Sequence, residues 1–301
     1  MEMGKKPDET LMKKNEHTHC LICNSEKLNK LIGYEKDNLV KCKSCGFVFC
    51  KQIPSLQELN THYEGYPRNN YNSPITIKRY NELLDLFEPY RETNKILDIG
   101  CGDGYFLEVA NKRGWIVYGT EFTETALNSC IKKGIKMNKG ILKASNYPEA
   151  IFDIVTSFEV IEHINNPQDE VNEIKKILRK NGLFYFTTPN FNSLSRSILK
   201  DDWNVIEYPE HLSYYTCSTI NRLLKSNGFL KKKIETTGIN FSRLNAGINK
   251  KETTTTNNEN IEELRKKTES KIIFKFLKKI VNSILDYSKK GDTIKGWYIR
   301  S

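Results

Sequence analysis

The four cysteines nearest the N-terminus have the spacing that points most directly to chemistry. They form two CxxC pairs, Cys20 with Cys23 and Cys42 with Cys45. Each pair makes a tight turn that lets two thiolates face one ion, and two such turns complete a tetrahedral zinc site. Because four thiolates leave no position open for a substrate, the zinc would be structural. The spacing predicts a zinc ribbon over residues 17–52 with a short β-hairpin between the pairs; four free thiols are the alternative.

A glycine-rich turn forms a second candidate site, in the stretch "ILDIGCGDGYF". An apolar run ends at Asp98, and glycines then alternate from Gly100 to Gly104. Glycine lets the backbone approach a ligand closely and adopt positive φ. The GxGxG spacing differs from the GxGxxG of dinucleotide sites, and the carboxylates of Asp98 and Asp103 would repel a pyrophosphate. They would suit a cofactor that carries an ammonium and a sulfonium group; a generic nucleotide-binding turn is the alternative.

Acid–base side chains gather in a third stretch, "EYPEHLSYY", which contains Tyr208, Glu210 and His211. An imidazole with an unperturbed pKa of about 6.5 can take a proton near neutral pH. A neighbouring carboxylate would orient the ring and stabilise its charged form. This stretch predicts a histidine general base beside a carboxylate, and closing the pocket is the structural alternative. Glu162 and His163 in "EVIEHI" also have side chains suited to catalysis.

The elements that must position these side chains alternate between strand and helix from residue 95 onward, which predicts a parallel sheet covered on both faces. Strands are expected at 95–99, 115–120, 135–138, 153–158, 182–187, 229–238 and 292–299. Helices are expected at 104–113, 124–133, 168–179 and 216–227. Residues 1–16 are expected to be a disordered tail, 53–92 a connecting helical segment, and 93–301 one α/β domain.

Four blocks of this domain resemble the class I S-adenosylmethionine-dependent methyltransferases: "LDIGCGDGYF", "YGTEFTETAL", "FDIVTSFEVIEHINNP" and "GLFYFTTPN". The resemblance covers residues 96–229 and implies a Rossmann-like, seven-stranded sheet whose last strand, "GDTIKGWYIR", is antiparallel. It implies S-adenosylmethionine as cofactor over the carboxyl ends of the strands. The residues expected to bind it are Asp98, Gly100, Cys101, Gly102, Glu121, Phe122, Phe158 and Glu159.

Within this resemblance, Glu121 would accept the ribose hydroxyls and Phe122 would face the adenine. Glu162 and His163 would shape the loop beside the methyl donor, with direct catalysis as the alternative. The stretch "EYPEHLSYY" also resembles a segment of the deoxysugar C-methyltransferases, which likewise carry an N-terminal cysteine-rich zinc module. That resemblance implies that His211 is the base and that Tyr208 and Glu210 assist it.

The acceptor expected from these features is a nucleotide-linked sugar or a surface-polysaccharide intermediate. Methylation of RNA is an alternative, because some ribosomal RNA methyltransferases place a zinc ribbon before this fold. Nucleic acid is not the expected partner, since the ribbon is not strongly basic. O-methylation of a different small molecule stays open, and so does a zinc-ribbon interaction protein without enzymatic activity. The acceptor atom and the oligomeric state stay open as well.

The net charge is +10, and many of the lysines lie near the C-terminus. Residues 246–290 are expected to form an insertion, a polar loop and a basic helix, that separates the last two strands. The helix at 271–290 carries an apolar stripe, which favours packing on the sheet, a lid or a dimer contact; peripheral contact with an anionic membrane is the alternative. The stripe consists of Ile273, Phe276, Leu277, Ile280, Val281, Ile284 and Tyr287. The sequence contains no apolar run of about 18 residues and no signal peptide, so a cytoplasmic location is expected.

Overall fold

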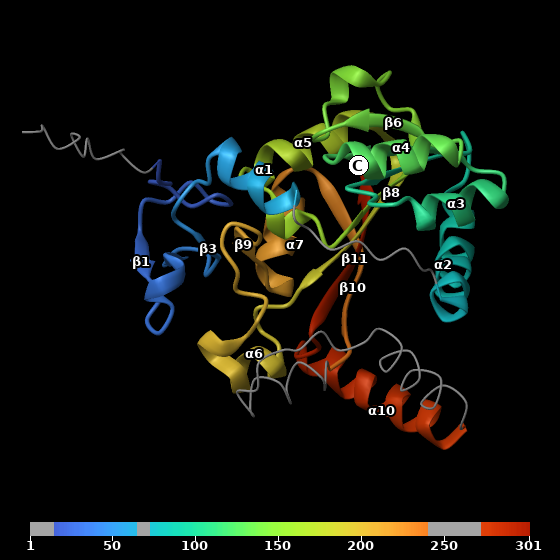
Figure 1. The fold of residues 1–301 in the computed structure, drawn as a ribbon. Helices are drawn as coiled ribbons and strands as arrows, with labels where there is room; N and C mark the ends of the chain where they lie inside the picture. The colour runs from blue at the N-terminus through green and yellow to red at the C-terminus, as the bar shows by residue number, and fades with distance from the viewer. Residues whose placement is uncertain (1–14, 65–72, 240–271) are drawn as a thin grey trace, which may run out of the picture.

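A computed structural model describes residues 15–64, 73–239 and 272–301, and its larger sheet has seven strands (Figure 1). The order across the sheet is β10-β11-β8-β7-β4-β5-β6, with β11 antiparallel to both of its neighbours. The strands are β4 (Lys95–Ile99), β5 (Ile116–Glu121), β6 (Lys136–Lys139), β7 (Phe152–Phe158), β8 (Leu178–Pro189), β10 (Phe229–Thr237) and β11 (Thr293–Arg300). This arrangement confirms the Rossmann-like sheet with an antiparallel last strand.

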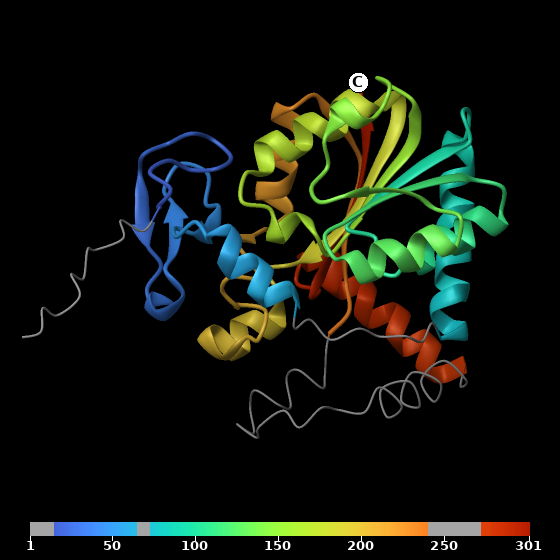
Figure 2. The ribbon, with the colours of Figure 1, turned by 45° about the horizontal axis from the view of Figure 1, so that its top comes forward.

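Helices cover both faces of this sheet, which is why its central strands carry nearly continuous apolar runs. On one face the core joins α2 (Pro74–Phe87), α3 (Tyr105–Lys112) and α4 (Glu124–Lys132). On the other face it joins α5 (Pro167–Ile177) and α7 (Cys217–Ser226). The ribbon module, residues 17–52, lies on the α5 and α7 side (Figure 2). The predicted helices at 104–113, 124–133, 168–179 and 216–227 are therefore present, with slightly different ends.

A second, four-stranded sheet belongs to the ribbon module and has the order β1-β2-β3-β9. Its strands are β1 (Leu28–Lys30), β2 (Leu39–Cys42), β3 (Val48–Cys50) and β9 (Ser213–Tyr214). The pairing of β1 with β2 is antiparallel, as the predicted hairpin requires. Sequence reasoning missed β9, which comes from the segment after β8 and pairs with β3. The ribbon module and the larger domain therefore share one sheet.

Near the N-terminus the structure corrects the predicted tail. Glu16 forms an antiparallel bridge with Gln52, and the amide of Ile53 donates to the carbonyl of Asn15 at 2.8 Å. The prediction of a disordered tail is therefore wrong for residues 15 and 16, because these backbone groups pair with the end of the ribbon module. The rest of that predicted tail lies outside the described residues.

Between β8 and β9 the chain forms α6 (Leu194–Leu199), a helix that the sequence pattern does not predict. Residues 53–92 contain α1 (Leu56–Glu64) and α2. Leu84 and Phe87 of α2 are buried in the core beside the sheet. Short 3-10 helices lie in the segments between these elements. They are η1 (Glu35–Asp37), η2 (Glu88–Tyr90), η3 (Ala144–Asn146), η4 (Ile161–His163) and η5 (Lys200–Asp202).

The basic helix before the last strand is α10 (Ile272–Ser288), and it separates β10 from β11 as predicted. The amide of Thr236 donates to Asp286 Oδ1 at 2.8 Å, and Leu285 is buried on β10. Ile284 and Tyr287 of the predicted apolar stripe are 62% and 94% exposed, so the described part of the stripe does not pack on the sheet. The loop expected at 246–271 lies outside the described residues. Among the described helices, none is long and apolar enough to cross a membrane.

Candidate functional site

The glycine-rich turn connects β4 to α3 and lies at the carboxyl end of β4. Gly100, Gly102 and Gly104 have φ of +62°, +53° and +73°, the left-handed region that favours glycine. A Cβ atom on Gly100 would lie 2.7 Å from Val160 Cγ2, whereas one on Gly102 would meet no atom within 4 Å. The turn therefore packs against the loop after β7 at Gly100, whereas the space beside the backbone of Gly102 is open.

Asp98, the acidic residue of β4, is buried beneath this turn. Thr156 Oγ1 donates to Asp98 Oδ1 at 2.7 Å. Burial raises the pKa of Asp98 to about 7, and the nearby charge of Glu121 adds to the rise while the Thr156 hydrogen bond opposes it. A cationic ligand at this place would favour the ionised carboxylate, as expected for a site that holds an ammonium and a sulfonium group.

Glu121 ends β5 and points its carboxylate at the same turn. Its Oε2 accepts from the amide of Gly102 at 3.0 Å, and its Oε1 accepts from the amide of Phe122 at 2.8 Å. Phe122 is 46% exposed beside it. A carboxylate, an open glycine backbone and an exposed ring fit the ribose and adenine of S-adenosylmethionine. When bound, that cofactor supplies an electrophilic methyl group.

Cys101 and Phe158 also lie at these strand ends, but their side chains face the core. The thiol of Cys101 lies 3.9 Å from that of Cys130 and 4.0 Å from Met137 Sδ. Only the backbone of Cys101 is therefore placed to face a cofactor. The ring of Phe158 packs against Phe106, with ring centroids 5.0 Å apart.

Glu159 follows Phe158 and is exposed, with φ of +53°. Its amide donates to the carbonyl of Thr187 at 3.0 Å, which turns the chain away from β7 toward η4. Its side chain therefore lies at the same carboxyl edge as the glycine turn. Its contact with the cofactor stays a prediction.

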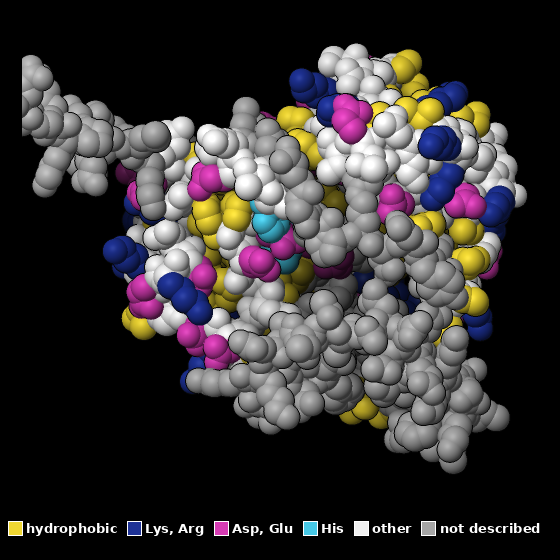
Figure 3. All heavy atoms as spheres, in the orientation of Figure 1, with side chains coloured by type: hydrophobic (Ala, Val, Ile, Leu, Met, Phe, Trp, Pro, Cys, Tyr) yellow, Lys and Arg dark blue, Asp and Glu magenta, His cyan; other side chains and the backbone are white. Residues whose placement is uncertain are grey.

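Three acid–base side chains, Glu162, His163 and His211, form a cluster beside this edge, which we call the His–Glu cluster. Each offers a ligand or acid–base atom, and these atoms all lie within 4.8 Å of one another. The rings of His163 and His211 have centroids 4.7 Å apart. The amide of Leu212 donates to the carbonyl of Glu162 at 2.9 Å, which joins the two chain segments. Figure 3 shows histidine side chains beside acidic ones on this face.

Glu162 and His211 are both oriented by hydrogen bonds. Thr188 Oγ1 donates to Glu162 Oε2 at 2.9 Å. His211 Nδ1 hydrogen-bonds the carbonyl of Val205, and since a carbonyl only accepts, this assigns the proton to Nδ1 and leaves Nε2 as the basic nitrogen. His211 therefore has the tautomer that a general base acting through Nε2 requires.

Burial sets the electrostatics of the other two members. It holds the pKa of Glu162 well above its usual range, and the charges of Glu159 and Glu210 add to the rise. Burial also lowers the pKa of His163 to about 3, with a further lowering from His211. His163 is therefore a neutral imidazole near neutral pH.

The three predicted catalytic residues do not converge on one point. Only His211 joins the His–Glu cluster. Glu210 Oε2 lies 3.7 Å from Nε2 of His62, on α1. The hydroxyl of Tyr208 accepts from Gln52 Nε2 at 2.9 Å and donates to Glu58 Oε1 at 3.3 Å, so it links the ribbon module to α1. Burial and the Glu58 charge raise the pKa of Tyr208 to about 12.

Sequence reasoning missed His62 because α1 carries no motif around it. The approach of Glu162 and His163 to His211 was also missed, because it depends on tertiary packing between distant segments. The two CxxC pairs, in contrast, are sufficient to find the cysteine cluster.

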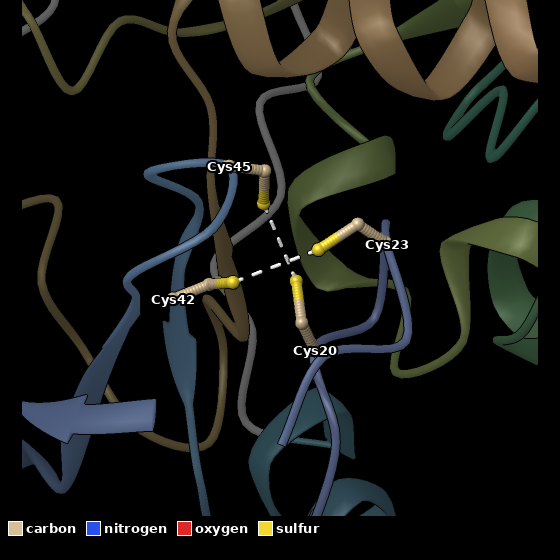
Figure 4. A group of neighbouring side chains, drawn as sticks. All are labelled: Cys20, Cys23, Cys42 and Cys45. Atoms are coloured by element: carbon tan, nitrogen blue, oxygen red, sulfur yellow. Dashed lines mark hydrogen bonds between the residues drawn. The ribbon is translucent and has the colours of Figure 1, made fainter. Parts of the chain in front are cut away.

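The four cysteines of the ribbon module do converge (Figure 4). The Sγ atoms of Cys20 and Cys45 lie 3.5 Å apart, and those of Cys23 and Cys42 lie 3.6 Å apart. All four sulfurs lie within 4.8 Å of one another. In a tetrahedral zinc site with Zn–S bonds of about 2.3 Å, the distance between two sulfurs is about 3.8 Å. The donor set and its geometry fit zinc.

Residues 75–231, just over half of the chain, match the family model described as a methyltransferase domain. The chain belongs to this family. With the seven-stranded sheet, the match identifies a class I S-adenosylmethionine-dependent methyltransferase domain. Curated relatives carry the name ubiquinone biosynthesis O-methyltransferase. The one from Azoarcus sp. (strain BH72) is 32% identical over 155 residues, 41% of this chain and 66% of its own. The one from Pelagibacter ubique is 27% identical over 201 residues, 59% of this chain and 80% of its own.

Solved structures show the same fold. A SAM-dependent methyltransferase from Archaeoglobus fulgidus aligns with a TM-score of 0.51 and 18% identity, covering 75% of this chain and 93% of its own. Phosphoethanolamine N-methyltransferase 2 of Haemonchus contortus, in complex with S-adenosyl-L-methionine, aligns with a TM-score of 0.53 and 18% identity. The alignment covers 84% of this chain and 62% of that protein.

The curated relatives are named for O-methylation, so the resemblance to deoxysugar C-methyltransferases stays a prediction. In the Azoarcus relative and in one from Pasteurella multocida the match covers less than two thirds of the protein, 66% and 46%.

Proposed function

We propose that this methyltransferase methylates a hydroxyl group of a nucleotide-linked sugar or a related surface-polysaccharide intermediate, with His211 as general base. The observation that carries this proposal is the orientation of His211. Its Nδ1 is held by the Val205 carbonyl, and its ring lies in the His–Glu cluster beside the glycine turn. Each turnover releases one proton from the acceptor, and Nε2 of His211 is the nitrogen that takes it.

The lining of this site supports a polar acceptor. The carboxylate of Glu162 and the imidazole of His163 lie beside His211, and the carboxylate of Glu210, the preceding residue in the chain, pairs with His62. These groups accept or donate hydrogen bonds to sugar hydroxyls, whereas an aromatic acceptor would favour apolar walls. A hydroxyl oxygen is favoured over carbon because the curated relatives are named O-methyltransferases. Their name also makes a phenolic acceptor the second candidate.

We also propose that the four-cysteine cluster holds a structural zinc ion. Four thiolates complete its coordination, so its contribution is to folding. The ribbon module would then hold β9, and with it the segment that carries His211, against the larger domain.

Replacing His211 by Gln tests the base. Loss of general-base catalysis is expected to lower kcat by about 10²–10⁴-fold, with little change in S-adenosylmethionine affinity. Turnover is measured on panels of nucleotide-linked sugars and of phenols, and cofactor affinity by calorimetry. His17→Gln is the matched control, because His17 bonds Asn165 outside the cluster.

Undiminished turnover in His211→Gln would remove the base assignment. Methylation of phenols but not of sugars would replace the acceptor class and leave the base assignment standing.

A further inference from the structure

We propose that Glu162, His163 and His211 bind a divalent transition-metal cation, in addition to the ion of the four-cysteine cluster. Each residue offers one ligand atom, and the three atoms lie within 4.8 Å of one another. Two imidazoles and one carboxylate suit cations such as Mn²⁺, Fe²⁺ or Zn²⁺ better than Mg²⁺ or Ca²⁺, which prefer oxygen ligands.

The carboxylate of Glu162 carries the strongest sign of a ligand. Its side chain is 2% exposed, and Thr188 occupies Oε2. Among the described residues, Oε1 has no hydrogen-bond partner, although it is buried. A buried carboxylate oxygen without a partner is costly, and a cation placed between it and the two imidazoles would remove that cost.

The hydrogen bonding of His211 is that of a metal ligand. Histidines that bind metals donate their other ring N–H to a carbonyl or carboxylate, which fixes the tautomer and the ring orientation. His211 does so through Nδ1 to the Val205 carbonyl. The Leu212 amide, bonded to the Glu162 carbonyl, holds the two ligand-bearing segments together.

The charge around the His–Glu cluster also favours a cation. The carboxylates of Glu159 and Glu210 act on Glu162 through their negative charge. Three protein ligands leave coordination positions open, in contrast to four thiolates.

The inference rests on the proposed function in one respect, the acceptor hydroxyl. A hydroxyl oxygen that takes an open position on the cation has a lowered pKa, so its proton leaves to water more readily. Because Nδ1 bonds Val205, Nε2 is the ligand nitrogen and does not take the proton. The inference therefore keeps the proposed hydroxyl acceptor and replaces the general base with metal-assisted loss of the acceptor proton to water.

Binding of Mn²⁺ is measured by electron paramagnetic resonance on the full chain with zinc in its ribbon module. The wild type is compared with Glu162→Gln, His163→Gln and His211→Gln, and His17→Gln is the matched control. We expect one Mn²⁺ per chain in the wild type and in His17→Gln. Each cluster variant should weaken binding by at least about tenfold. Zinc content and S-adenosylmethionine affinity show that each variant is folded.

Absence of Mn²⁺ binding in the folded wild type, or equal binding in all variants, would overturn the metal site. If methyl transfer then persists without added metal and still needs His211, the general-base proposal stands alone. If Mn²⁺ binds as expected but no hydroxylated acceptor is methylated, the metal site stands and the proposed function fails.

Discussion

The four-cysteine cluster and the His–Glu cluster both bring polar ligands together, but from different distances along the chain. The cysteines come from two tight turns of one module, 20–23 and 42–45, and all four face one point. The His–Glu cluster joins η4 to the residues just before β9, two segments that α5, β8 and α6 separate in the sequence. The cysteine cluster comes from one module and supplies all four ligands of a tetrahedral site. The His–Glu cluster is assembled from distant segments and supplies three ligand atoms.

The local cluster supports the assembled one. Strand β9 pairs with β3 at Val48 with Tyr214 and Phe49 with Ser213. The amide of Cys50 also donates to the carbonyl of Leu212 at 2.9 Å, next to His211. The ribbon module therefore pairs with the backbone next to His211. We expect the position of His211 to depend on the fold that the cysteines maintain.

Loss of one of the four thiolates is expected to have the largest effect on the contact between the ribbon module and the segment of His211. Cys42→Ser is expected to abolish zinc binding and unfold the ribbon module, because a zinc-held module gets its folding energy from the metal. Without β3, the segment of His211 shifts, and misplacement by about 1 Å can cost about 10²-fold in turnover. S-adenosylmethionine affinity should change little, since the glycine turn lies at β4 and β5. Metal analysis, turnover and calorimetry measure the three quantities.

Cys217→Ser is the control for a lost thiol, because Cys217 begins α7 and does not belong to the four-cysteine cluster. It should keep its zinc and its turnover. Full turnover in a zinc-free Cys42→Ser would show that the ribbon module does not position His211.

The same contrast explains what the sequence could predict. Strand and helix positions followed from short apolar runs and helical spacing, so β4 to β8 and the antiparallel β11 lay where the pattern expected them. The cysteine cluster followed from spacing alone. In contrast, β9 has two residues and pairs with a distant strand, so no local pattern marks it. His62 and the neighbours of His211 depend on that same packing.

A second prediction concerns the contact between the glycine turn and the loop that carries Glu162. Gly100→Ala and Gly102→Ala both place alanine at positive φ, which lowers the free energy of unfolding by about 1–2 kcal/mol in each variant. Only Gly100→Ala also drives a methyl group to 2.7 Å from Val160 Cγ2, which adds about 1–3 kcal/mol of overpacking. Chemical denaturation should therefore find Gly100→Ala the less stable, and its turnover should fall more.

Val160→Ala in the Gly100→Ala background tests the cause, because it removes the crowded methyl groups. It should recover most of the difference from Gly102→Ala. Equal stability of the two single variants would show that the loop after β7 yields to the contact.

A third prediction separates the cofactor side from the His–Glu cluster by pH. Burial raises the pKa of Asp98 from its ordinary value of 3.8 to about 7, so the folded protein binds more protons than the unfolded chain between these values. The stability of the cofactor-free protein should therefore fall as pH rises from about 4 to 7, and Asp98→Asn should remove that part of the slope. A cationic cofactor favours the ionised form, so its affinity should weaken by up to about tenfold for each pH unit below about 7.

Thermal unfolding across pH and calorimetry at several pH values measure both effects. Glu124→Gln is the control, because Glu124 lies at the surface on α4 and pairs with Lys139. A slope that persists unchanged in Asp98→Asn would place the titrating group elsewhere.

The smallest effect is expected at Tyr208, which the sequence predicts as a helper of the base and the structure places between the ribbon module and α1. Tyr208→Phe removes the hydrogen bonds to Gln52 and Glu58, worth about 1 kcal/mol of stability. Turnover should fall by less than about tenfold, because a hydroxyl outside the His–Glu cluster has no proton to take from the acceptor. Gln52→Ala should reproduce the change in turnover, since it breaks the same link from the other side. If turnover falls by about 10²-fold or more in Tyr208→Phe but stays near wild type in Gln52→Ala, the Tyr208 hydroxyl takes part in catalysis. Tyr208 would then act together with the three residues of the His–Glu cluster.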